Sequence, residues 1–252
     1  VELRSIGVFL STFIDASLDS DGRMRCSFSI AGPTTYRFSS SENAFGSGMN
    51  LQNIPVAEKA KIKDPNYIKL PNIRKLFIPD DGYTFFDMDL DRADLQVVVW
   101  EADDPMLKAA LRLGADVHLL NVYSLDNKEP PPLEELVESH PAYPSHRGPR
   151  KHKREFAKVF CHATNYVGSA KTVAAHTGRT VHEVDRAQKL WFEQHPGILK
   201  WHRRTEEQIR RYRFVENRWG YRWYIFDRLE QLLPEACAWV PQSTVGILIN
   251  KI

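Results

Sequence analysis

The sequence predicts an α+β protein whose second half is largely helical. Side chains in residues 83–90 (YTFFDMDL) alternate between two faces, as in a strand, and residues 92–101 are then predicted to form a helix. The chain has 252 residues, 42% of them hydrophobic and 26% charged, which is typical of a folded globular protein. A chain of this length can form one or two domains without disulfide bonds.

Proline limits regular structure in the next segment, residues 126–150, apart from a turn at 133–138. The residues on either side look like parts of one site, so we interpret this segment as an inserted loop rather than a linker. Its prolines are Pro130, Pro131, Pro132, Pro141, Pro144 and Pro149.

The elements after this loop are predicted to be mostly helical. Helices are expected over residues 151–167 and about 183–213. Residues 214–226 (FVENRWGYRWYIF) are typical of a hairpin that turns at its glycine. A last helix is expected over about 228–239, with a further segment beginning after Pro241.

Composition also bears on location and partners. The three cysteines, Cys26, Cys161 and Cys237, form no CxxC pair, which argues against a disulfide framework or structural zinc and favours a reducing compartment. No apolar run approaches the ~20 residues of a membrane helix, so no membrane partner is expected and a cytoplasmic location is predicted. The net charge of only +2 does not by itself indicate a nucleic-acid partner.

Two carboxylates share one face of the predicted strand at 83–90. Alternation places Asp87 and Asp89 together near its end, with Asp91 and Asp94 just beyond. Magnesium takes one or two protein carboxylates together with substrate phosphates, so this end of the strand is a candidate metal site. In the alternative interpretation, Asp91 caps the next helix and Asp94 completes a turn of the capping-box type. The opposite face, expected to be core, carries Phe86, Met88 and Leu90.

A basic helix is the second candidate feature. With ~3.6 residues per turn, Arg154, Lys158, His162 and Tyr166 fall on one side of it. Arginine and lysine can hold a polyphosphate, and the two rings can support a flat base. The alternative is a solvated basic face on a surface helix. Acids that hold a divalent ion and bases that hold phosphate are complementary parts of a phosphoryl-transfer site.

Seven blocks, in this order, resemble the polymerase domain of family A DNA polymerases, the bacterial polymerase I group with its phage and organellar relatives. The resemblance covers about residues 20–252. The blocks are YRFSSS at 36–41, NLQNIP at 50–55, IRKLFI at 73–78, DLDRADLQ at 89–96, DVH at 116–118, the helix side chains Arg154, Lys158, His162 and Tyr166, and PQST at 241–244.

The resemblance implies a right-hand polymerase architecture, with an antiparallel palm sheet and a largely helical fingers subdomain. Residues 1–97 would be part of the palm, with the end of the thumb at the N-terminus. Residues 98–232 would be the fingers, including the insertion at 126–150, and residues 233–252 an incomplete return toward the palm. The family's second metal-binding block, a His-Asp-Glu, lies beyond Ile252, so the chain is expected to be a fragment that is inactive alone.

The resemblance also assigns the metal and nucleotide contacts. Asp89 would bind two Mg²⁺ ions and the main-chain carbonyl of Leu90 one of them. His118, Arg154 and Lys158 would hold the triphosphate, with Asp89, Arg154 and Lys158 as the catalytic set. The contacts to the sugar and base of the incoming nucleotide would be His162 and Tyr166, together with Asp94, which would exclude ribonucleotides.

The DNA contacts implied by the resemblance are Arg37, Gln52, Asn53 and Gln242. The implied activity is that of a DNA-directed DNA polymerase: template-directed transfer of dNMP to a primer 3′-OH by a two-metal mechanism, with primer–template DNA and dNTPs as partners. The location implied is the cytoplasm of a bacterial or phage-infected cell, or an organelle.

Several positions depart from the family pattern and favour a phage or organelle-type member. Asp94 stands where glutamate is usual, Gln96 where arginine is usual, and His162 where phenylalanine or tyrosine is usual. Val167 occupies a position that is usually glycine, with Gly168 one residue late.

Two other functions are weighed against DNA synthesis. A single-subunit RNA polymerase shares the palm and fingers design, but the acidic residue Asp94 disfavours it. A non-catalytic DNA-binding remnant would bind primer–template with steep salt dependence and would not extend it. The retention of Asp89, Arg154 and Lys158 disfavours the remnant.

Overall fold

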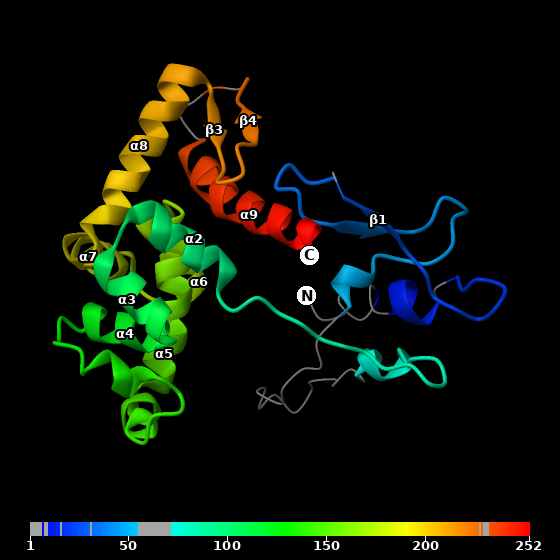
Figure 1. The fold of residues 1–252 in the computed structure, drawn as a ribbon, viewed down its shortest axis with the longest axis horizontal. Coiled ribbons are helices and arrows are strands. Elements are labelled where there is room, and N and C mark those ends of the chain that lie inside the picture. Colours follow the sequence, from blue (N-terminus) through cyan, green and yellow to red (C-terminus); the bar gives the residue numbers. More distant parts are fainter. Residues whose placement is uncertain are drawn as a thin grey trace. The chain divides into compact units, whose positions relative to one another are not determined.

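The computed structural model describes residues 7, 10–15, 17–30, 32–54, 72–226, 228 and 232–252. Two predictions extend beyond these ranges. The block at 50–55 ends at a residue outside them, and the helix predicted at about 228–239 begins partly outside them. The chain divides into two compact units, Val1–Leu90 and Asp91–Ile252 (Figure 1).

The α+β fold class is confirmed, because helices and small antiparallel sheets occur together in the described part of the chain. Helices dominate in the second unit, as expected. None of the helices in the described ranges combines the length and apolarity needed to cross a bilayer.

The first unit contains a short antiparallel ribbon. Its strands pair Ser27 with Ser41 and Ser29 with Ser39. The unit also has a small core of Phe13, Met49 and Ile73. The elements, in order, are η1 (Leu10–Ile14), β1 (Ser27–Ser29), β2 (Ser39–Ser41), η2 (Leu51–Asn53) and η3 (Ile73–Leu76).

The prediction of a strand at 83–90 is wrong for the part of the chain that the structure describes. The segment is extended, but it pairs with no strand among the described residues. Its expected core face is therefore uncovered: Phe86 is 82% exposed and Met88 is 90% exposed. Only Leu90 is partly buried. Alternation encodes which side chains share a face, but a strand also requires a neighbour that accepts its backbone hydrogen bonds.

The second unit is a helical assembly with one hairpin. The helix predicted at 92–101 is confirmed as α2. The described elements, in order, are α2 (Ala93–Ala102), α3 (Pro105–Leu113), α4 (Val117–Leu125), η4 (Leu133–Leu136), α5 (Tyr143–Asn165), α6 (Ala170–Thr177), α7 (Val181–Gln194), α8 (Pro196–Tyr212), β3 (Phe214–Glu216), β4 (Arg222–Tyr224) and α9 (Leu233–Lys251).

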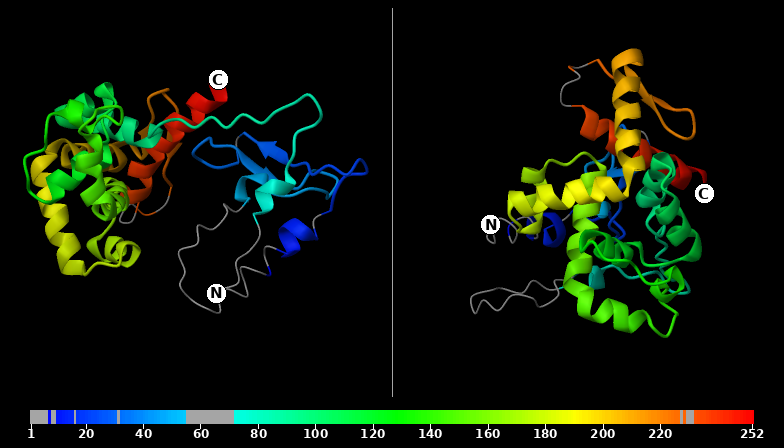
Figure 2. Two further views of the ribbon diagram at one scale, coloured as in Figure 1. Left: turned by 90° about the horizontal axis from the view of Figure 1, so that it is seen from below. Right: turned by 90° about the vertical axis from the view of Figure 1, so that its left-hand side faces the viewer.

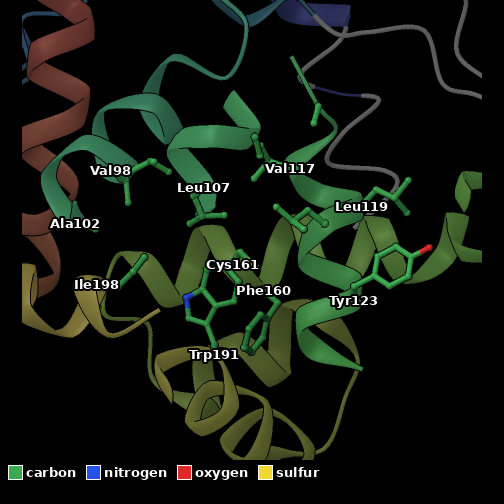
Figure 3. Close-up of a cluster of buried hydrophobic side chains, with 14 of the residues drawn as sticks. Val98, Ala102, Leu107, Val117, Leu119, Tyr123, Phe160, Cys161, Trp191 and Ile198 are labelled. Atoms are coloured by element: carbon green, nitrogen blue, oxygen red, sulfur yellow. The ribbon is translucent and has the colours of Figure 1, made fainter. Parts of the chain in front are cut away.

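The core of the second unit is built from side chains of α2, α3, α4, α5, α7 and α8 (Figure 3). Leu107, Leu119 and Phe160 are fully buried, and Trp191 is 1% exposed. The Trp191 indole N–H donates to Oδ1 of Asn165 at 3.2 Å, so the large ring is buried without leaving its polar atom unsatisfied. This core fixes α5 against α4 and so determines which face of α5 remains available.

Helix α5 begins earlier than predicted, inside the segment interpreted as a loop. It starts at Tyr143, with Pro144 in its first turn and Pro149 in its interior. Pro144 is compatible with the first turn, where its missing N–H has no intrahelical partner. Pro149 is accommodated within a long helix that packs against α4. The turn predicted at 133–138 is confirmed as η4.

The last elements agree with the prediction except at two places. The hairpin at 214–226 is confirmed as β3 and β4. The helix predicted at 183–213 is two helices, because Pro196 begins α8 after a break at His195. Helix α9 continues through Pro241 instead of ending before it, because its packing against α2, α8 and β3 outweighs one lost hydrogen bond (Figure 2).

Candidate functional site

A basic face lies where the start of α4 meets α5. It carries three of the predicted phosphate-binding residues: His118 from α4, and Arg154 and Lys158 from α5. Arg154 is largely buried, with its side chain 18% exposed, whereas Lys158 is exposed. Asp116 joins Arg154 to the backbone of His118 at the start of α4, and Lys158 follows one turn beyond Arg154 on α5.

Asp116 connects the two helices of the basic face. It is the N-cap of α4, where its Oδ1 accepts hydrogen bonds from the backbone N–H groups of His118 and Leu119, each at 3.1 Å. Its Oδ2 accepts from Arg154 Nε at 2.6 Å and from the Tyr143 hydroxyl at 2.8 Å. Burial alone would raise the pKa of Asp116, but these donors, Arg154 first, hold it below its ordinary value. The carboxylate is therefore charged at neutral pH.

His118 is neutral at pH 7. Burial lowers its pKa to about 4, and the charge of Arg154 acts in the same direction, while Asp116 opposes it. Its Nδ1 is buried and has no hydrogen-bond partner among the described residues. A neutral imidazole beside two cations can donate one N–H to a phosphate oxygen without adding a third charge.

Two rings continue the same side of α5 beyond Lys158. His162 is exposed, Tyr166 is half-buried, and their ring centroids lie 4.7 Å apart in an edge-to-face arrangement. Tyr166 is the C-cap residue of the helix. Val167 follows with φ of +60°, the left-handed conformation that favours glycine. Val167 therefore adopts a backbone conformation that suits the glycine usual at this position.

The start of α2 does not have the N-cap that the alternative interpretation of Asp91 predicted. The N-cap residue is Arg92, in the left-handed region, and no side chain caps the helix. The Asp91 carboxylate instead pairs with Arg92 at 2.6 Å. The interpretation of Asp91 as a cap is therefore wrong, because its ion pair takes the place of the capping bond. Asp94 lies in the first turn of α2 and is half-buried.

Arg92 connects the start of α2 to the basic face. Its Nη1 donates to the carbonyl of Ala115 at 2.8 Å, one residue before the α4 cap, and its charge also acts on His118. The neighbouring Gln96, where arginine is usual, donates to the carbonyl of Asp91 at 2.7 Å.

Three predicted DNA contacts lie in the first unit, near the ribbon. Gln52 Nε2 donates to the carbonyl of Phe38 at 2.9 Å, which places η2 beside the residues that precede β2. The Asn50 side chain caps η2. Arg37, Gln52 and Asn53 are all exposed. Two blocks separated in sequence therefore lie side by side and present their polar side chains at the surface.

The fourth predicted DNA contact, Gln242, is half-buried on α9. The hairpin is bound to the two residues that follow Gln242: Asn217 Nδ2 donates to the Ser243 hydroxyl at 3.0 Å, and Trp219 Nε1 donates to the Thr244 carbonyl at 2.9 Å. The hairpin and the helix therefore pack together next to Gln242.

The predicted metal ligands, Asp89 and Leu90, end the extended segment of the first unit. Asp89 is exposed and forms no ion pair with any described residue. Within the described ranges, no group of three or more histidine, cysteine or acidic side chains is assembled to hold a metal ion. A carboxylate and a main-chain carbonyl are both hard oxygen donors, so the residues present suit a Mg²⁺ ion that also takes phosphate ligands.

No role was predicted from the sequence for two residues: Asp116, which contacts Arg154, and Tyr143, which contacts Asp116. Asp116 could have been recognised as an N-cap, because an aspartate just before a helix is a known capping signal. Tyr143 had no such signal, because its contact with Asp116 spans 27 positions of the chain. Only the fold places it there.

Comparison with known proteins identifies the family. The model of DNA polymerase family A matches residues 1–232. DNA polymerase I of Chloroflexus aurantiacus is 29% identical over 227 residues, which is 87% of this chain and 20% of that protein. DNA polymerase I of Deinococcus radiodurans is 26% identical over 232 residues, 89% of this chain and 21% of that protein. The chain thus spans about a fifth of the length of these relatives.

A phage protein and a solved structure are also similar. The DNA polymerase of Mycobacterium phage D29 is 22% identical over 222 residues, 88% of this chain and 31% of that protein. The polymerase domain of Pol1 from M. smegmatis, solved with DNA primer-template and dNTP, matches with a TM-score of 0.66 at 20% identity. That match covers 97% of this chain and 38% of the solved one, and it shows a shared fold. The chain belongs to DNA polymerase family A.

Proposed function

We propose that this chain takes part in template-directed DNA synthesis, in which a dNMP is transferred to a primer 3′-OH. The observation that carries the proposal is that Asp116 joins His118 to Arg154: it accepts from the His118 backbone N–H at 3.1 Å and from Arg154 Nε at 2.6 Å, with Lys158 one turn farther along α5. Family membership supports the same reaction, and so does the solved relative that holds primer–template and dNTP.

The basic face would bind the triphosphate of the incoming dNTP. Arg154 offers a planar fork of donors, Lys158 a mobile point charge, and His118 a neutral N–H. Donors held in place before the reaction stabilise charge as it develops on the phosphates. His162 and Tyr166, farther along the same side of α5, would contact the base and sugar, and Asp94 would discriminate against a ribose 2′-OH.

Asp89 and the carbonyl of Leu90 would hold magnesium. Two ions bound there would lower the pKa of the primer 3′-OH and neutralise charge on the triphosphate and pyrophosphate. Arg37, Gln52, Asn53 and Gln242 would contact the primer–template, and contacts to sugar, phosphate and minor groove are independent of sequence.

Lys158→Ala tests the proposal. We expect the variant to bind dATP at least tenfold more weakly than the parent chain in isothermal titration calorimetry, because an exposed cation facing the phosphates is removed. Affinity for a fluorescent primer–template, measured by anisotropy, should change by less than about twofold, since the assigned DNA contacts lie elsewhere.

Lys153→Ala is the matched control. Lys153 lies on the same helix and forms an ion pair with Asp126 at 2.6 Å, on the side of α5 away from Lys158. It should leave dATP affinity unchanged. Loss of DNA affinity in Lys158→Ala with unchanged dATP affinity would show that the basic face is misassigned.

A further inference from the structure

We propose that Tyr143 is a positioning residue for the triphosphate site: its hydroxyl orients Asp116, which in turn holds Arg154. The inference rests on the proposed function, since it concerns how Arg154 is held for phosphate. It also gives part of the segment at 126–150 a role, because Tyr143 lies within that segment and begins α5.

The geometry places the three groups in a chain. The Tyr143 hydroxyl donates to Asp116 Oδ2 at 2.8 Å, and Arg154 Nε donates to the same oxygen at 2.6 Å. Tyr143 is 7% exposed, and the side chain of Asp116 is 3% exposed. With Oδ1 occupied by the α4 cap, Oδ2 is the oxygen shared by both donors. A buried carboxylate with four donors has one orientation.

The ion pair leaves the outer part of the guanidinium available. Arg154 contacts Asp116 through Nε, and the terminal nitrogen Nη1 forms a long hydrogen bond of 3.5 Å to Glu155 within the described part of the chain. A free arginine side chain samples many rotamers, and binding a ligand restricts them. Holding it through Nε before the ligand arrives reduces the ordering that binding must impose.

Tyr143 itself is fixed by the rest of the segment. Its hydroxyl also contacts Glu138 at 3.2 Å, and the backbone N–H of Asp116 donates to the carbonyl of Leu136 at 2.8 Å. The residues just before Tyr143 are therefore held against the start of α4.

Tyr143→Phe removes only the hydroxyl. We expect the variant to bind inorganic tripolyphosphate and dATP three- to tenfold more weakly in calorimetry, because Asp116 and Arg154 lose their common anchor. The matched control is Tyr123→Phe, which loses a hydroxyl of similar burial, 6% exposed, that contacts His146 instead of Asp116. It should bind both ligands as the parent chain does, even where its thermal stability falls by the same amount.

A double-mutant cycle separates positioning from general stability. Asp116→Asn keeps the cap, since asparagine caps a helix as well as aspartate, but it removes the charge that holds Arg154. We expect this variant to bind tripolyphosphate more weakly, and Tyr143→Phe to add nothing in its background. Additive losses in the double variant would overturn the proposal. If Tyr143→Phe does not fold, unchanged affinity in Asp116→Asn alone overturns it.

The outcomes also distinguish this inference from the proposed function. If Lys158→Ala loses affinity and Tyr143→Phe stays within twofold of the parent chain, Tyr143 does not position Arg154, but the triphosphate face stands. If Lys158→Ala is also unchanged, both proposals fail.

Discussion

At the scale of single residues, Val167 is the least expected conformation in the second unit. It is a β-branched residue at φ of +60°, directly after the helix that carries the basic face. A Cβ in this region costs roughly 1–2 kcal/mol. The neighbouring Gly168 cannot be replaced by a residue with a side chain without a shift, since a Cβ there would lie 2.7 Å from the carbonyl oxygen of Ala163. Gly168, one position after the residue that is usually glycine, is thus required by close packing and not by a left-handed backbone.

Replacing Val167 by glycine and by alanine separates strain from packing. Both variants lose the valine contacts with the core, but alanine keeps the strained Cβ. We expect Val167→Gly to be about 0.5–1 kcal/mol more stable than Val167→Ala, because relief of strain exceeds the added chain entropy of glycine. Urea unfolding of the two variants measures the difference. Equal stability, or a more stable alanine variant, would contradict the assignment of strain.

At the scale of elements, sequence patterns predicted the features that depend on residues close together in the chain, such as which side chains share a helix face. The side of α5 with Arg154, Lys158, His162 and Tyr166 follows from helical spacing alone, and the helix is confirmed. The start of α5 was missed, because proline composition suggested a loop where packing against α4 maintains a helix. The meeting of His118 with Arg154 is tertiary and was expected only through the family resemblance.

Pro149 offers a test of how α5 tolerates its proline. A proline in a helix interior removes one hydrogen bond and costs about 3 kcal/mol or more where nothing compensates. We expect Pro149→Ala to raise the free energy of unfolding by about 1 kcal/mol or more, and to raise the helical signal in circular dichroism.

Pro144→Ala is the internal control for this prediction. Pro144 lies in the first turn, where no intrahelical bond is lost, so its replacement should not stabilise the protein. A comparable gain in both variants would point to an effect on the unfolded chain instead of the helix.

At the scale of the whole molecule, buried ionisable groups tie distant parts of the second unit together. His195 Nδ1 and Asp104 Oδ2 lie 2.7 Å apart, with both side chains almost fully buried, and they join the α7–α8 junction to the start of α3. His202 contacts the carbonyl of Asn165 at 2.8 Å, and burial lowers its pKa. The stability of this unit should therefore depend on pH.

His118 sets the expected pH window. Its pKa in the folded chain, lowered by burial from 6.5 to about 4, means that the unfolded chain binds the proton first as the pH falls. The free energy of unfolding should therefore decrease between about pH 6.5 and pH 4, on the order of 1–2 kcal/mol from this residue. Urea unfolding followed by tryptophan fluorescence at pH 7, 5.5 and 4.5 measures the decrease.

His118→Gln should flatten the pH dependence, whereas substitution of the exposed His176 should not. Below about pH 4 a further loss is expected from Asp104 and Asp116. Burial opposes ionisation of both, but His195 and Arg154 hold their pKa values below the ordinary one. An unfolding free energy that is constant from pH 7 to pH 4.5 would contradict the burial of a neutral His118.

The uncovered run at 83–90 has a consequence for handling the protein in solution. Phe85 is 66% exposed and Met88 is 90% exposed, on an extended backbone that pairs with no strand among the described residues. Such an edge is a template to which a second molecule can add its own copy of the run, strand against strand. Concentration and storage time are therefore variables that light scattering should monitor from the first purification onward.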